Sequence, residues 1–132
     1  MRKEIEIAGH KIGEGHPTFI IAEMSANHNM DFDRAVAIMQ AAKDAGADAV
    51  KLFPAGNLGP GYLKAMRAPL SHIDFLAVGG VDEKNVAEYI RAGAIGAGVG
   101  GNLAKKALIE AGKFDEIEAC ARALVEAVKS AK

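Results

Sequence analysis

One stretch decides the fold: Ile73-Asp74-Phe75-Leu76-Ala77-Val78-Gly79-Gly80. Its largely apolar run ends at two glycines, which is typical of a strand that is buried on both faces and followed by a tight turn. Further along, Asp82 is suited to cap a helix, Val86 and Tyr89 fall on one helical face, and Gly93 is suited to end that helix. Strand, glycine pair and helix in this order predict a parallel sheet with right-handed helical crossovers.

The same order of strand and helix recurs along the chain. Strands are predicted at residues 19–22, 49–53 and 94–99, because each is a nearly continuous apolar run. Asp31 is suited to begin the helix after the first strand, and Gly46 is suited to end it. The other helices are expected from Pro60, after a glycine-rich loop at residues 56–59, at about residues 103–111, and from about residue 115.

The chain has 132 residues, and we expect a single α/β domain. Residues 1–17 are predicted to form a β-hairpin and a loop, and residues 18–132 to form four βα units. A closed eight-unit barrel needs about 250 residues, so four units correspond to half of a TIM-type barrel. We favour completion to eight strands by a homodimer, because unpaired sheet edges invite strand pairing. The alternative is an open, flavodoxin-like parallel sheet with helices on both faces.

Composition excludes several classes of partner. Half of the residues are hydrophobic, a quarter are charged, and the formal net charge is −1. Because there is no basic stripe with interleaved aromatic residues, we expect neither nucleic acid nor an anionic membrane as a partner. No apolar run approaches the roughly 20 residues of a membrane span, and the first residues lack an apolar signal region. With a single cysteine as well, we expect a cytoplasmic protein.

The predicted strand ends carry two pairs of glycines, Gly79-Gly80 and Gly100-Gly101. In parallel architectures ligands bind at the carboxyl ends of strands, where glycine lets the backbone approach an anion and helix N-termini offer free N–H groups. The sequence therefore predicts a site for a small molecule that carries a phosphate or a carboxylate. The alternative is that these glycines only make tight turns.

Lys51 and the polar residues after the first strand are the candidate reactive groups. Lys51 lies inside the apolar run at residues 49–53, where a desolvated lysine could supply a neutral amine for Schiff-base chemistry, or could simply pair with Glu23. Glu23, Asn27 and His28 could act as acid–base groups or contact a substrate, or could belong to a loop whose polar groups bond one another. Glu23 and His28 lack a third metal ligand, so we expect no metal and no cofactor.

Residues 3–52 resemble the start of sialic acid and pseudaminic acid synthases. The resemblance rests on Gly13-Glu14-Gly15-His16-Pro17-Thr18-Phe19-Ile20-Ile21-Ala22-Glu23-Met24-Ser25-Ala26-Asn27-His28 and on Ala45-Gly46-Ala47-Asp48-Ala49-Val50-Lys51. Those enzymes condense phosphoenolpyruvate with a sugar in a metal-dependent barrel. The resemblance implies that Glu23 and Lys51 are active-site residues, although the later strands and metal-binding histidines of that barrel are missing here.

From about Val50 to the end, the sequence is similar to the last third of 2-keto-3-deoxy-6-phosphogluconate (KDPG) aldolase. The matching stretches are Val50-Lys51-Leu52-Phe53-Pro54-Ala55, Ala77-Val78-Gly79-Gly80-Val81 and Gly98-Val99-Gly100-Gly101-Asn102-Leu103. The resemblance implies that Lys51 is the Schiff-base lysine, that Phe53 is a substrate contact, and that the glycine pairs with Asn102 bind phosphate. The general-base glutamate of that family lies on an early strand that is absent here.

Two resemblances that meet at Val50-Lys51 favour a chimeric or designed half-barrel. We expect it to bind an anion at its strand ends with little or no turnover, because in a two-fold dimer Lys51 faces its own copy instead of a base. Two other functions stay open. One is a Schiff-base aldolase acting on 2-keto-3-deoxy-6-phosphogluconate or pyruvate through Lys51, which would make the chain a carbon–carbon lyase, and the other is a phosphoenolpyruvate-dependent synthase.

Overall fold

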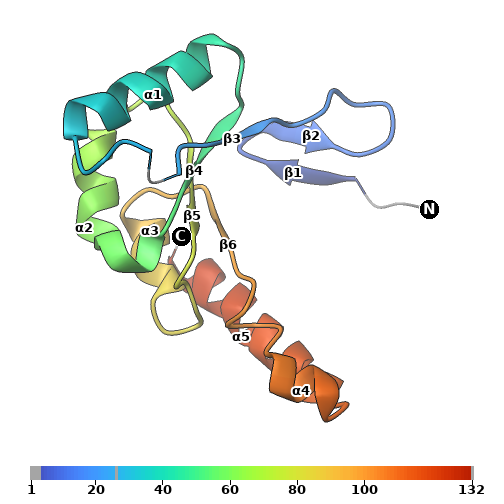
Figure 1. Cartoon of the computed structure of the whole chain (residues 1–132). Coiled ribbons are helices and arrows are strands. Elements are labelled where there is room, and N and C mark those ends of the chain that lie inside the picture. Colours follow the sequence, from blue (N-terminus) through green and yellow to red (C-terminus); the bar gives the residue numbers. More distant parts are fainter. Residues whose placement is uncertain (1–3, 26, 132) are drawn as a thin grey trace.

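The computed structural model describes residues 4–25 and 27–131. Figure 1 shows a β-hairpin that stands apart from a four-stranded sheet, helices packed along that sheet, and a helical arm at the C-terminal end. The elements are β1 (Ile5–Ile7), β2 (His10–Ile12), β3 (Ile21–Glu23), α1 (Phe32–Asp44), β4 (Ala49–Leu52), α2 (Ala55–Arg67), β5 (Phe75–Val78), α3 (Val86–Arg91), β6 (Gly96–Gly98), α4 (Lys106–Glu110) and α5 (Phe114–Ala131).

The predicted N-terminal hairpin is confirmed. Strands β1 and β2 pair antiparallel, with Ile7 opposite His10. The two residues between them, Ala8 and Gly9, both have positive φ, at 49° and 81°. This is the backbone of a type I′ turn, whose twist matches that of the strands it joins.

The main sheet has the strand order of half a barrel. Its four strands are parallel and adjacent in chain order, β3-β4-β5-β6. A flavodoxin-like sheet reverses its strand order at a switch point, so the flavodoxin-like order given as the alternative is wrong, and closure of the open sheet by a second copy stays a prediction. The observed strands are shorter than the predicted apolar runs. Ile73 and Ala94, for example, are buried but lie before the first paired residues of β5 and β6, so their apolar side chains mark burial and not strand pairing.

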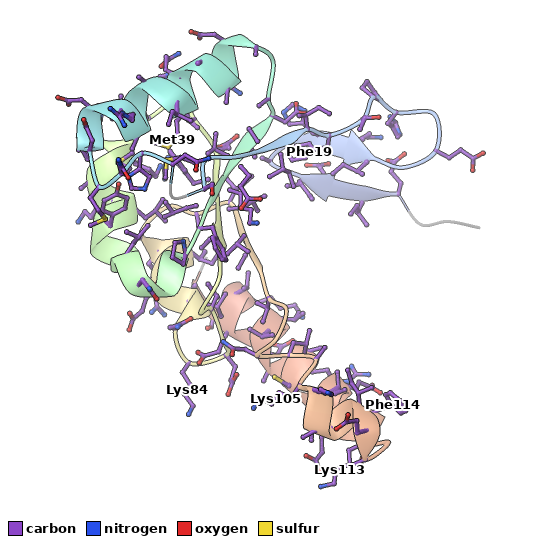
Figure 2. All side chains as sticks on the ribbon, viewed as in Figure 1. Phe19, Met39, Lys84, Lys105, Lys113 and Phe114 are labelled. Carbon is purple, nitrogen blue, oxygen red and sulfur yellow. The ribbon has the colours of Figure 1, made fainter. Side chains whose placement is uncertain are left out.

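The core lies between the sheet and its helices. Val50, Leu52, Phe75 and Ala77 are almost fully buried and alternate with the less buried Lys51, Leu76 and Val78. Helices α1, α2 and α3 contact β4, β5 and β6 in turn. Figure 2 shows Met39 beneath α1, on the side that faces the sheet, and this side chain is completely buried. The opposite face of the sheet is left open in the single chain.

Helix α2 corrects one prediction about the strand ends. Residues 56–59 were expected to form a loop, but they are helical from Ala55 onwards. The helix is broken at Gly59, whose φ of 79° and ψ of 163° are not helical, and Pro60 then begins the second part as predicted. Glycine permits this left-handed φ, and proline tolerates the first helical position because no N–H bond is needed there.

Helix α1 follows the sequence signals closely. Asp31 accepts a hydrogen bond from the Arg34 amide at 3.0 Å, and Gly46 at the end of the helix has a φ of 95°. Helical spacing places Phe32 on the same face as Ala35 and Met39, which are buried, but Phe32 is 42% exposed. No helix among residues 4–25 and 27–131 has the length and apolarity needed to cross a membrane.

Candidate anion site at the strand ends

Lys51 and Glu23 form an ion pair on the open face of the sheet. The two residues are register partners on β4 and β3, and Lys51 Nζ lies 2.9 Å from Glu23 Oε2. Lys51 Nζ also lies 4.9 Å from the centroid of the Phe53 ring. The side chain of Lys51 is 26% exposed and that of Glu23 is 46% exposed. The structure therefore joins three of the predicted site residues in one partly solvated cluster.

The face on which Lys51 lies follows from strand alternation. Its neighbours Val50 and Leu52 are buried against the helices, so the side chain of Lys51 projects from the other face. That is the face that would line the interior of a closed barrel. The carboxylate on the neighbouring strand explains how a lysine is accommodated inside an apolar run.

Gly79 and Gly80 are required by close packing. The Gly56 amide donates to the Gly79 carbonyl at 2.7 Å, and a Cβ on Gly80 would lie 3.0 Å from the Cα of Gly56. A Cβ on Gly79 would lie 2.6 Å from the ring of Phe53. Both glycines also have positive φ, so a tight turn and a close approach of two loops account for this pair.

The second glycine pair has no such packing role. Gly100 and Gly101 are exposed, and a Cβ on either would meet nothing within 4 Å. The Asn102 side-chain amide donates to the Val81 carbonyl at 3.0 Å, which links the loop after β6 to the loop after β5. Among the hydrogen bonds of the described residues, the backbone amides of Gly100, Gly101 and Asn102 donate none. Consecutive free amides of this kind can bind an anion.

Asn27 and His28 are placed differently from each other. Asn27 is exposed, whereas His28 is 5% exposed and its Nδ1 has no hydrogen-bond partner among the described residues. The His28 carbonyl accepts a hydrogen bond from the Asp31 amide, ahead of α1. No hydrogen bond or ion pair among the described residues joins either side chain to the Lys51–Glu23 pair, so their predicted roles as substrate contacts stay predictions.

Two residues that support the strand-end loops were missed in the sequence. Asn85 donates to the Gly80 carbonyl at 3.0 Å and accepts from the Asp82 amide, so it holds the loop after β5. The Tyr89 hydroxyl donates to the Ala55 carbonyl at 2.8 Å, and burial raises the pKa of Tyr89. The contact of Asn85 could have been found, because an Asp and an Asn three residues apart before a helix are a usable signal in the sequence. The contact of Tyr89 could not, because it joins residues that are distant in the chain.

Comparison with known proteins relates the chain to an aldolase family. Residues 27–120 match the family model described as KDPG and KHG aldolase. The 2-dehydro-3-deoxy-6-phosphogalactonate aldolase of Escherichia coli is 51% identical over 63 residues, which are 47% of this chain and 31% of that enzyme. A solved structure described as native KDPGal has a TM-score of 0.65 and 38% identity, and the alignment covers 73% of this chain and 45% of the other.

The second resemblance is also confirmed. The N-acetylneuraminate-9-phosphate synthase of Mus musculus is 44% identical over 52 residues, which are 39% of this chain and 14% of that protein. The chain thus spans less than half the length of each protein compared here. Because the aldolase family model covers most of its residues, the chain belongs to the KDPG and KHG aldolase family.

Proposed function

We propose that the chain binds a small molecule bearing a phosphate or a carboxylate at the ends of β5 and β6. The observation that carries the proposal is the loop Gly100-Gly101-Asn102, whose amide N–H groups are unused among the described residues and which Asn102 ties to the loop after β5. Backbone amides bind anions without a charged side chain, because their N–H dipoles can converge on one oxygen. Lys51, on the strand next to β5, supplies the cationic group of the same face.

Little or no turnover is expected from the single chain. Glu23 already forms an ion pair with the ammonium group of Lys51, and both side chains are partly exposed to water. A catalytic amine must instead be freed of its proton and of its carboxylate partner before it attacks a carbonyl group. Similarity to an aldolase and to a synthase within one chain supports a chimeric origin for this half-barrel.

A charge introduced at Gly101 tests the anion site. Gly101→Asp places a carboxylate among the free amides without a steric clash, because a Cβ there meets nothing within 4 Å. We expect inorganic phosphate to bind about tenfold more weakly or worse, a cost of about 1.4 kcal/mol, because the new carboxylate repels it. The measurement is a phosphate titration followed by the amide resonances of Gly100, Gly101 and Asn102 in NMR.

The matched control is Gly61→Asp on α2. It makes the same change of residue and charge at a glycine where a Cβ also meets nothing within 4 Å. Phosphate affinity should match that of the unmodified protein. Equal affinity in the Gly101→Asp and Gly61→Asp proteins would mean that phosphate, if it binds, binds somewhere other than this loop.

A second candidate function is imine formation between Lys51 and pyruvate. The observation that favours it is the 2.9 Å contact, because Glu23 is placed to accept the proton that Lys51 must lose. The freed amine then attacks the keto carbon and a carbon–nitrogen bond forms. The carbonyl oxygen leaves as water after taking up one proton from the amine nitrogen and the proton that Glu23 had accepted, so the imine keeps one N–H proton and the positive charge. A protonated imine with this connectivity activates the neighbouring carbon for aldol chemistry.

Borohydride trapping with pyruvate tests this candidate. Hydride reduces the imine to a stable secondary amine, so mass spectrometry should find one adduct on the unmodified protein and none on Lys51→Ala. Lys106→Ala is the control, since that lysine is 88% exposed on α4, and it should keep the adduct. No adduct on the unmodified protein, or one that survives Lys51→Ala, would remove Schiff-base chemistry at Lys51.

A further inference from the structure

The two edge strands of the main sheet present matching surfaces. The sheet ends at β3 on one side and at β6 on the other, and neither outer edge pairs with another strand of the described residues. An unpaired edge with apolar neighbours is a template for another parallel strand. The two edges differ in the surface beside them, which is a groove at β6 and an exposed side chain at β3.

Beside β6 lies an apolar groove between the edge strand and α5. Its volume is about 500 Å³, and its wall includes Ala97, Val99, Leu103, Leu124, Val125 and Val128. The glycines of β6 pack beside Leu76 and Val78 on the open face of the sheet, so Ala97 and Val99 project towards the helices. The groove therefore lies on the helical side of the β6 edge, where a fifth strand would place its own helix-facing side chains.

At the other edge, β3 presents an apolar side chain of the matching kind. Ile20 is 49% exposed, although its carbonyl accepts hydrogen bonds from Asp48 and Ala49 and so continues the β3–β4 ladder. Ala22 packs against the core, and alternation places Ile20, two residues earlier, on the same helical side. One edge thus carries a large apolar side chain, and the other carries an apolar groove on the corresponding side.

We propose that β3 of a second copy pairs in parallel with β6 and places its Ile20 in this groove. Lys129 at the rim of the groove is already paired with Glu126 at 2.8 Å, so the pairing rests on the apolar contact and on the two unpaired edges. Ile20, half exposed in the single chain, becomes buried along with Val125, which is 52% exposed.

Two copies paired in this way complete a closed eight-stranded barrel. Four consecutive parallel strands span half of an eight-stranded barrel, so a two-fold axis along the barrel joins β6 of each copy to β3 of the other. The closed dimer also buries the open face that carries Ile21, Leu76 and Val78. This inference rests on the edges and the groove and does not depend on anion binding at Gly100 and Gly101.

Light scattering on a sizing column tests the pairing with two single variants. The unmodified protein should have twice the mass of the 13.8 kDa chain. Ile20→Lys and Val125→Asp should each have the mass of one chain, because each places a charge in the apolar contact. Both side chains are about half exposed in the single chain, so each variant should keep its fold, which circular dichroism checks.

Mixing the two variants identifies which surfaces meet. In a mixed dimer one interface joins an unmodified groove to an unmodified β3. The other interface joins the two substituted positions, where the introduced lysine and the introduced aspartate carry opposite charges. The mixture should therefore recover the dimer mass that neither variant shows alone. Ile109→Lys is the control at 47% exposure on α4, outside the contact, and it should stay dimeric.

Each other outcome overturns the proposal. An unmodified protein with the mass of one chain, or of three or more, excludes the two-copy barrel. A dimer that survives Ile20→Lys or Val125→Asp forms through another surface. Folded monomeric variants that fail to combine when mixed show that β3 and the groove do not meet.

Discussion

Phe75→Ala should lower the free energy of unfolding by about 3–5 kcal/mol, the range for truncating a buried phenylalanine. Phe75 lies in the middle of the main sheet on β5, opposite Val50 of β4, and its side chain is completely buried. Removing the ring leaves a cavity between the sheet and its helices that the surrounding backbone cannot fill. Because small domains are stable by only about 5–15 kcal/mol, such a loss removes a large part of the total.

The matched control is Phe114→Ala. Phe114 is 63% exposed, and Figure 2 shows it at the far end of the arm formed by α4 and α5, away from the sheet. Its replacement should change stability by no more than about 0.5 kcal/mol. Urea unfolding followed by circular dichroism, at one protein concentration, measures both. Similar losses in the two variants would contradict a core centred on β5.

Gly56→Ala is expected to destabilise the protein by about 1–3 kcal/mol, as overpacking does elsewhere. A Cβ at this position would lie 2.9 Å from the Cα of Gly80 and 3.2 Å from the Gly79 carbonyl oxygen. These are backbone atoms, so they cannot move aside as a flexible side chain can. The loops after β4 and β5 must separate, and the hydrogen bond from the Gly56 amide to Gly79 must weaken.

Gly61→Ala on the same helix should instead stabilise the protein. A Cβ there meets nothing within 4 Å, and alanine in a helix is favoured over glycine by about 0.5–1 kcal/mol. Urea unfolding of the Gly56→Ala and Gly61→Ala proteins measures the difference between their free energies of unfolding. If both variants were stabilised, the close contact between the two loops would not exist in solution.

The Gly56→Ala protein also bears on the proposed function. Its substitution separates the loop after β4 from the loop after β5, while the free amides of Gly100 and Gly101 belong to the loop after β6. Phosphate affinity that persists in this variant would assign binding to the last loop alone. The same titration would show whether the loop that contains Gly79 and Gly80 contributes to the site.

Much of the architecture could be predicted because its signals are local. The Asp31 cap, the stop at Gly46 and the turn at Ala8 and Gly9 each act over a few residues, and the structure shows all three. The loop expected at residues 56–59 is helical instead, because glycine content by itself does not exclude a helical turn when only Gly59 departs from helical angles. The exposure of Phe32 was likewise decided by what packs beside α1, which periodicity does not specify.

The candidate site could likewise be predicted only in part. The sequence by itself determined that Lys51, Glu23 and the two glycine pairs lie at or near strand ends, because a run of apolar residues specifies a buried strand and its neighbours specify the turn. Only the tertiary structure decided that Glu23 pairs with Lys51, that Gly79 and Gly80 serve the packing of Phe53 and Gly56, and that Asn102 ties two loops together. These contacts join residues on different strands, and their distances depend on strand register and loop packing, which no local pattern contains.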